Sequence, residues 1–270
     1  ALPSSERQGV PEAIEANRLS VFIGVPFMFS ILAETNFRRT PDLSSLRVCV
    51  SASAPMPVKQ NQAFHARFGM YVRQLYGSTE TGTISVNIGE NPGESLASVG
   101  TALPGITIDV WTDDGRPAAV GESGEVVVKS PAAIDSYADA AAANRESFRD
   151  GYFLTGDLGF LDARGCLSLV GRKTFFINKG GYKINPYDIE SLLESHPKVQ
   201  EAVVVGIATA LGDEKVKAVI VANAPCTPDE IIEYCRGKIA AFKIPAVVEI
   251  RDSLPKSATG KVRKQLLRET

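Results

Sequence analysis

A strand–helix–strand pattern in the first third of the chain constrains the fold more than any other feature. Leu46–Val50 is a short β-branched run that stops at the small-residue turn Ser51–Pro55. Val58–Phe68 has apolar residues at helical spacing, and Gly69 then ends the predicted helix. Tyr71–Tyr76 is strand-like again and runs into the turn GSTETG. This order predicts an α/β unit with its functional turn at the carboxyl end of the second strand.

From about Val99 the chain becomes rich in strands and turns. Ile106–Trp111 alternates in polarity, a turn follows at Asp113–Gly115, and Gly124–Lys129 is another strand. Ala138–Phe148 is rich in alanine and is predicted to be helical. We therefore expect a small, barrel-like β subdomain after the α/β unit.

Gly171-Arg172 marks the predicted domain boundary. The fold class is α/β: residues 1–171 would form part of a large domain, and residues 172–270 a small, mobile α+β domain. The small domain has predicted strands at 175–178, 181–184, 199–206, 215–221 and 247–250, and predicted helices at 186–195 and 228–241.

Composition excludes several classes of partner. The 270 residues carry a formal net charge of -2 and 22% charged residues, which favours neither nucleic acid nor an anionic membrane as partner. No apolar run approaches the roughly 20 residues of a membrane span, and the first residues do not resemble a signal peptide. Cys49, Cys166, Cys226 and Cys235 form no CxxC pair and have no histidine at metal-ligand spacing. We expect a cytoplasmic protein with reduced, mostly buried thiols and no structural zinc.

The segment YGSTETG combines small residues, hydroxyls and one carboxylate at a strand end. Small residues let the backbone approach a ligand, hydroxyls can donate to phosphate oxygens, and the Glu80 carboxylate can hold Mg²⁺. Taken alone, the segment fits a ligand site and an ordinary capped helix start equally well.

Two further segments are ambiguous when each is taken by itself. Asp157 follows a glycine at the predicted end of a strand, where a carboxylate can accept hydrogen bonds from a ribose diol; an aspartate that serves a turn is the commoner case. Lys261, in LPKSATGKVRK, follows a glycine on an exposed stretch and could neutralise phosphate charge; a solvated basic tail is the commoner case.

Together the segments resemble, in order and spacing, the motifs of the adenylate-forming superfamily of acyl-CoA synthetases, peptide-synthetase adenylation domains and firefly luciferase. The resemblance covers nearly the whole chain. The matching segments are Val25-Pro26, Ser51–Pro55, YGSTETG, SVGTALPG, GESGEVVVKSP, GYFLTGDLG, GRKTFFINKGGYKINPYDIE and LPKSATGKVRK.

The resemblance implies that a carboxylic acid reacts with ATP to give an acyl adenylate, from which a thiol, usually that of coenzyme A, displaces AMP. The implied contacts are Tyr76 with the adenine, Thr79 with the α-phosphate, Glu80 with Mg²⁺, Asp157 with the ribose, assisted by Arg172, and Lys261 with both the acyl carboxylate and the α-phosphate. Further implied cofactor-binding positions are Ser53, Ala54, Pro55, Gly77 and Ser78 for the nucleotide, and Gly180 and Gly181 for the pantetheine arm of coenzyme A.

These roles are physically reasonable. A carboxylate and a triphosphate repel each other, so that a lysine and a metal ion are needed to bring them together. A lysine on a mobile small domain can swing away before the thiol attacks, which is the domain alternation of the family. Its hinge residue is usually Asp or Lys, but here the position holds Thr174, which leaves the hinge assignment a hypothesis.

The Ser/Thr/Gly-rich phosphate loop of the family should precede Val25-Pro26, and residues 1–24 contain nothing similar. We therefore expect a fragment that lacks the amino-terminal half of the enzyme and is a poor catalyst alone. An acyl- or aryl-CoA synthetase is favoured because Ala241–Pro245 has the ligase form and no carrier domain follows Lys261. Another adenylating enzyme, or a non-catalytic subunit that pairs with a second chain, remains as an alternative. The acid is expected to be fatty or aryl.

Overall fold

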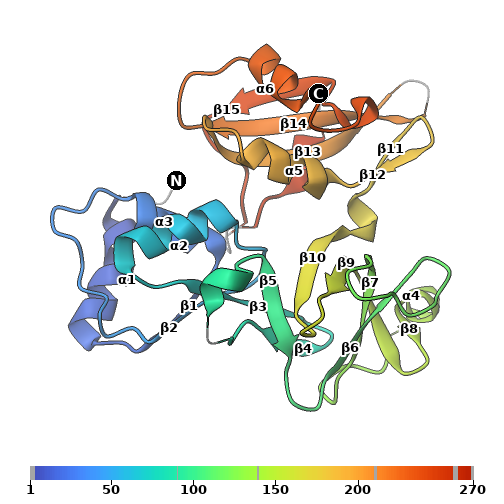
Figure 1. Ribbon diagram of the computed structural model, residues 1–270, viewed down its shortest axis with the longest axis horizontal. Coiled ribbons are helices and arrows are strands. Elements are labelled where there is room, and N and C mark those ends of the chain that lie inside the picture. Colours follow the sequence, from blue (N-terminus) through green and yellow to red (C-terminus); the bar gives the residue numbers. More distant parts are fainter. Residues whose placement is uncertain (1–3, 90, 139, 210–211, 258–260, 269–270) are drawn as a thin grey trace. The chain divides into compact units, whose positions relative to one another are not determined.

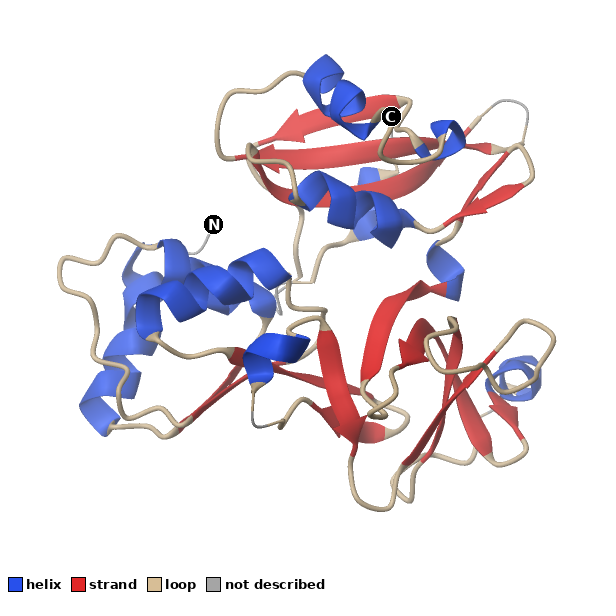
Figure 2. Cartoon of the chain, viewed as in Figure 1, coloured by secondary structure: helices blue, strands red, loops and turns tan. Residues whose placement is uncertain are grey.

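The computed structural model describes residues 4–89, 91–138, 140–209, 212–257 and 261–268. It divides into two compact units, Ala1–Leu169 and Val170–Thr270, and each is described by itself. Figure 1 labels the helices and strands, and Figure 2 separates them by type. The mixed α/β class predicted from the sequence is confirmed.

The first part of unit 1 is parallel α/β structure. Strand β1 pairs with β2 and β2 with β3, both in parallel, while Phe29, Cys49 and Phe64 are fully buried in the core between these strands and the helices. The predicted helix over residues 58–68 has those bounds, and Gly69 ends it in the left-handed conformation at φ 72°. The elements are α1 (Ser4–Asn17), β1 (Val21–Gly24), α2 (Pro26–Glu34), β2 (Val48–Ser51), α3 (Val58–Phe68) and β3 (Val72–Ser78).

The second part of unit 1 continues the same sheet with antiparallel strands. Its order is β1-β2-β3-β4-β5-β10-β9-β7-β6, with β8 paired to β9, so the β-rich part is joined to the parallel strands through β4 and β5. The elements are β4 (Gly82–Val86), η1 (Pro92–Ser95), β5 (Ser98–Ala102), β6 (Thr107–Trp111), β7 (Gly124–Lys129), α4 (Ala141–Ser147), β8 (Phe148–Arg149), β9 (Tyr152–Leu161) and β10 (Leu167–Arg172).

Unit 2 is a three-stranded sheet covered on both faces. Strand β13 pairs antiparallel with β14, and β14 pairs parallel with β15. Alternate side chains of β13 and β14 face two separate apolar clusters: one includes α5 and α6, and the other includes Leu254 and Leu267. The elements are η2 (Lys173–Phe175), β11 (Ile177–Lys179), β12 (Tyr182–Ile184), α5 (Pro186–Glu194), β13 (Val199–Ala208), β14 (Glu214–Ala222), α6 (Pro228–Cys235), η3 (Ala241–Lys243), β15 (Val247–Arg251) and η4 (Lys264–Leu267).

One predicted helix was too long. The helix expected over residues 228–241 begins at Pro228, where the Thr227 side chain accepts a hydrogen bond from the Glu230 amide, but it ends at Cys235. Arg236 is extended and Gly237 has φ 72°, a left-handed conformation that favours glycine and stops the helix. The strand expected at 175–178 likewise starts only at Ile177, because a 3₁₀ turn precedes it.

Candidate active site

The YGSTETG segment forms a tight β-hairpin. Strand β3 continues to Ser78, and after a short turn β4 returns antiparallel to it from Gly82. A Cβ atom on Gly77 would lie 2.4 Å from the Gly82 carbonyl oxygen, so the close approach of the two strands requires glycine. The alternative interpretation of this segment, a capped helix start, was therefore wrong.

A loop from the β-rich part braces this hairpin turn. Ser130 Oγ donates to the Thr81 carbonyl at 3.2 Å, and Tyr137 Oη donates to Glu80 Oε1 at 3.0 Å. The Ile134 amide also donates to the Glu80 carbonyl at 2.8 Å. Within the turn, Thr79 is exposed, Glu80 is half-buried and Thr81 is fully buried. Sequence reasoning missed Tyr137, because no local pattern distinguishes it from other loop residues. Ser130 lies in the matching segment GESGEVVVKSP, but no role was predicted for it.

Tyr76 and Asp157, both predicted site residues, are in direct contact. Tyr76 Oη donates to Asp157 Oδ2 at 2.7 Å, although the two residues are 81 positions apart in the sequence. Tyr76 is 8% exposed and lies on β3, and Asp157 lies on β9. The phenol therefore fixes the direction of one carboxylate oxygen of Asp157.

Asp157 was predicted to lie at a strand end, and this was wrong; it does not serve a turn either. It lies inside β9 at a bulge, where Gly156 has φ 72° and the ladder to β7 shifts register. The bulge is stabilised by the Gly156 amide, which donates to Glu125 Oε1 at 3.1 Å, and by the Asp157 amide, which donates to Thr155 Oγ1 at 3.0 Å. Bulges of this kind change the direction of a side chain next to a site.

The turn after β2 contains a strained residue. Ser53 has φ 73°, a left-handed conformation that costs a residue other than glycine about 1–3 kcal/mol. Ser53, Ala54 and Pro55 are all exposed. Since β2 and β3 are parallel, this turn and the YGSTETG turn both follow the carboxyl ends of neighbouring strands, at the same end of the sheet. The structure thus gathers the predicted positions 53–55, 76–80 and 157 within unit 1.

Unit 2 carries the remaining predicted residues. Gly180 and Gly181 form the exposed turn of the β11–β12 hairpin with φ 55° and 84°, and positive φ at both central residues is what a type I′ hairpin turn requires. Arg172 ends β10, and Lys261 is exposed with its carbonyl oxygen accepting from the Ser257 amide at 2.8 Å. Residues 258–260 of the LPKSATGKVRK segment lie outside the described residues.

Two family models match the chain in sequence order. The model described as AMP-binding enzyme matches residues 2–138, and the model described as AMP-binding enzyme C-terminal domain matches residues 188–261. The chain belongs to the AMP-binding enzyme family. The predicted superfamily is thereby confirmed.

Named relatives of this AMP-binding family member are ligases. Indoleacetate–CoA ligase of Aromatoleum aromaticum is 34% identical over 99% of this chain and 53% of its own length. Long-chain-fatty-acid–CoA ligase of Bacillus subtilis is 32% identical over 99% of this chain and 49% of its own length. The crystal structure of ATP-bound MatB from Rhodopseudomonas palustris matches with a TM-score of 0.87 and 32% identity, over 96% of this chain and 52% of that one. The chain therefore spans about half the length of these relatives.

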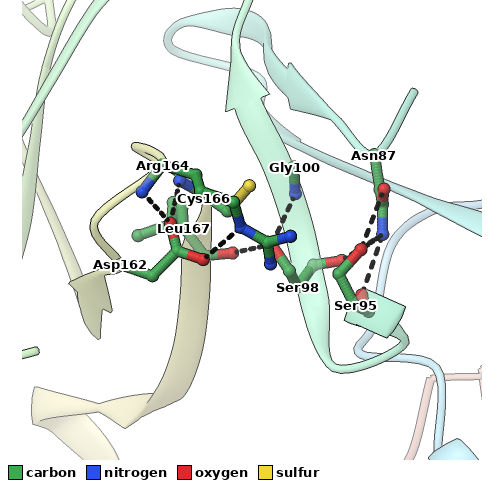
Figure 3. Close-up of polar contacts among 8 residues, drawn as sticks. All are labelled: Asn87, Ser95, Ser98, Gly100, Asp162, Arg164, Cys166 and Leu167. Carbon is green, nitrogen blue, oxygen red and sulfur yellow. Dashed lines mark hydrogen bonds and ion pairs between the residues drawn. The ribbon is translucent and has the colours of Figure 1, made fainter. Parts of the chain in front are cut away.

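A cavity of about 430 Å³ lies elsewhere in unit 1 of this AMP-binding family member. Its lining includes Asn87, Arg164 and Cys166 and none of the candidate residues. It lies beside the end of β4, at the other end of the β3–β4 hairpin from the YGSTETG turn. Figure 3 shows that the polar groups around it are engaged with one another. Asp162 Oδ1 accepts from the amides of Arg164 and Cys166, while Ser98 Oγ donates to the Leu167 carbonyl at 2.8 Å. The Ser98–Leu167 bond joins β5 to β10, and the Asp162 bonds order the turn between β9 and β10, so these bonds are structural.

The described part of the chain contains no group of three or more His, Cys, Asp or Glu side chains that could hold a metal ion. Its four cysteines are free, and burial raises the pKa of the Cys49 thiol to about 12. Among these same residues, no helix combines the length and the apolar character needed to cross a membrane.

Proposed function

We propose that the protein activates a carboxylic acid, fatty or aryl, with ATP to form an acyl adenylate and then transfers the acyl group to coenzyme A. The observation that carries the proposal is the Tyr76–Asp157 contact beside the hydroxyl-rich hairpin, in a chain whose named relatives are acid–CoA ligases. The Tyr76 ring would lie against the adenine. Asp157, held by Tyr76, would accept hydrogen bonds from the ribose hydroxyls, with Arg172 as its partner in this task.

The hairpin turn suits the phosphates and Mg²⁺. Thr79 is exposed and would donate to the α-phosphate, while Gly77 and Ser78 would let the nucleotide approach the backbone. Glu80 supplies a carboxylate oriented by Tyr137. Mg²⁺ is commonly held by only one or two carboxylates together with the phosphates of its substrate, so a single carboxylate fits this ion. When bound, Mg²⁺ would neutralise phosphate charge during the displacement.

Lys261 would act in the first half-reaction only. A cation that bridges the acyl carboxylate and the α-phosphate offsets the repulsion between two anions and stabilises the charge that develops in the transition state. In the second half-reaction the exposed Gly180–Gly181 turn would approach the pantetheine arm, since glycine presents no side chain to it. We propose residues 1–171 and 172–270 as the two moving domains, with Thr174 as the hinge. If Thr174→Pro left both half-reaction rates unchanged, the hinge would lie elsewhere.

We propose that the phosphate loop is supplied by residues outside this chain, which spans about half of its relatives. The longest natural reading frame containing the chain should therefore be tested, with ATP, Mg²⁺, coenzyme A and a panel of carboxylic acids. Mass spectrometry should detect one or more acyl-CoA products, and Lys261→Ala should lower their rate of formation by about 10²–10³-fold. AMP without thioester would favour an adenylating enzyme with another acceptor. Neither product would favour a non-catalytic subunit.

A further inference from the structure

The segment that carries Lys261 is held to the sheet of unit 2 at both of its ends. Leu254 is 6% exposed and Leu267 0% exposed, and both pack in the cluster on one face of β13–β14. Between them, Lys256 and Val262 form an antiparallel bridge, and the Arg263 amide donates to the Pro255 carbonyl at 2.8 Å. The two arms of this hairpin therefore determine where Lys261 lies on unit 2.

Each arm of the hairpin is fixed to the rest of unit 2 by an ion pair. Lys256 Nζ lies 2.6 Å from Glu201 Oε2, with the two side chains 17% and 25% exposed. Lys264 Nζ lies 2.8 Å from Glu190 Oε1, with the side chains 18% and 10% exposed. Both pairs are far less exposed than Arg236–Glu233, a surface pair of the same unit with side chains 65% and 74% exposed.

The Lys264–Glu190 pair joins three elements. Glu190 belongs to α5, and the oxygen that accepts from Lys264 also accepts from the Val204 amide of β13 at 2.7 Å. Lys264 Nζ lies 5.3 Å from the Phe175 ring centroid and 4.9 Å from that of Tyr187, close enough for cation–π attraction. The ammonium group is therefore confined by a carboxylate and two rings.

Confinement of this kind contributes more to geometry than to stability. Removing two charges from water has a large free-energy cost, which the attraction between them roughly offsets, so a buried pair is a weak source of net stability. Because Lys264 lies only three residues after Lys261, fixing its side chain fixes the path of the backbone that presents Lys261. A misplacement of about 1 Å in a reacting constellation can lower a rate about 100-fold.

We propose that Lys264 and Glu190 are positioning residues that hold the Lys261 hairpin in the arrangement needed for adenylation. The inference rests on the proposed function, because it gives Lys261 its role in the first half-reaction. Thioester formation, which would not use Lys261, should not depend on the pair.

The first test is hydrogen exchange in the 270-residue chain. Lys264→Met removes the ammonium group but keeps an apolar stem, and Glu190→Gln keeps an oxygen for the Val204 amide if the first variant folds poorly. We expect exchange of the Ser257 and Arg263 amides to accelerate at least about tenfold, while the amides of β13 and β14 remain protected. Lys217→Met, which breaks the Lys217–Glu249 pair elsewhere in the unit, is the matched control and should leave the hairpin amides unchanged.

The second test separates the half-reactions in the longest natural reading frame that contains the chain. ATP–pyrophosphate exchange should fall roughly 10- to 100-fold in Lys264→Met, whereas thioester formation from supplied acyl adenylate should change less than about threefold. Lys264→Arg retains the cation and should recover most of the exchange rate, and Lys217→Met should leave the ratio of the two rates unchanged.

Hairpin amides that stay protected in both Lys264→Met and Glu190→Gln would overturn the proposal, as would equal losses in the two half-reactions. If the wild-type protein performed neither half-reaction, the proposed function would fail instead. The amide hydrogen-exchange rates alone would then decide whether the Lys264–Glu190 pair orders the hairpin.

Discussion

The two units differ in how their sheets are covered. In unit 2 both faces of β13–β14 are packed, one by α5 and α6 and the other by the arms of the Lys261 hairpin. In unit 1 the helices cover one face of β1–β3, where Phe22 packs on Phe29. The opposite side chains of the edge strand β1 are exposed, Val21 by 50% and Ile23 by 63%.

The units also differ in the contacts that fix their candidate site residues. In unit 1, Glu80 and Asp157 are each fixed by a tyrosine from a distant part of the sequence. In unit 2, Lys261 is exposed, and the bonds that fix it lie in its own hairpin and in the two ion pairs beside it. The contrast agrees with the proposed function, in which the residues of unit 1 would serve both half-reactions and Lys261 would serve only one.

The largest effect is expected when Lys261, the exposed candidate residue of unit 2, is replaced. Lys261→Ala should lower ATP–pyrophosphate exchange by about 10²–10³-fold, the usual loss when one group that stabilises transition-state charge is removed. Thioester formation from supplied acyl adenylate should be nearly unchanged. The exposed neighbour Arg263→Ala is the control. Equal losses in both half-reactions for Lys261→Ala would mean that unit 2 does not act in one step only.

The next effect tests the packing of the two sheets. Leu267→Ala should lower the free energy of unfolding by about 2–4 kcal/mol, because Leu267 is fully buried and its truncation leaves a cavity. Ile23→Ala in unit 1 should change it by less than about 0.5 kcal/mol, as expected for an exposed side chain. Urea unfolding of the 270-residue chain measures both values. A larger loss for Ile23 would show that its face of the sheet is covered in solution.

A third effect separates two tyrosine–aspartate pairs within unit 1. Asp157→Asn should raise the KM for ATP about 10- to 100-fold, since hydrogen bonds to a charged group are worth about 1.5–3 kcal/mol. Asp109→Asn removes the charge from the equivalent Tyr152–Asp109 pair, with an oxygen–oxygen distance of 2.6 Å, and should leave the KM within about twofold. If both variants raised the KM equally, the Tyr76–Asp157 contact would have no particular role in nucleotide binding.

Sequence reasoning predicted what depends on neighbouring residues. The α3 bounds and the strand that leads into the YGSTETG turn follow from short segments with characteristic spacing. It could not predict that Tyr137 orients Glu80 from 57 residues away, or that Lys264 pairs with Glu190 across 74. Such contacts depend on which strands become neighbours, and no local periodicity records that. The bulge at Gly156 escaped prediction for a similar reason, because its φ is imposed by the pairing of β9 with β7.

The smallest expected effect concerns Ser53, where strain and function can be separated. Glycine adopts a φ of 73° without steric cost, but it loses more backbone entropy on folding, so Ser53→Gly should raise the free energy of unfolding by a net of about 0.5–1 kcal/mol. If Ser53 lies against the nucleotide, as the resemblance to the adenylate-forming superfamily implies, the same variant should weaken binding of ATP. A residue with no role at the site would give the gain in stability alone. Urea unfolding and steady-state kinetics of the one variant therefore distinguish a strained contact residue from a strained turn, and a loss of stability would show that the serine hydroxyl itself stabilises the turn.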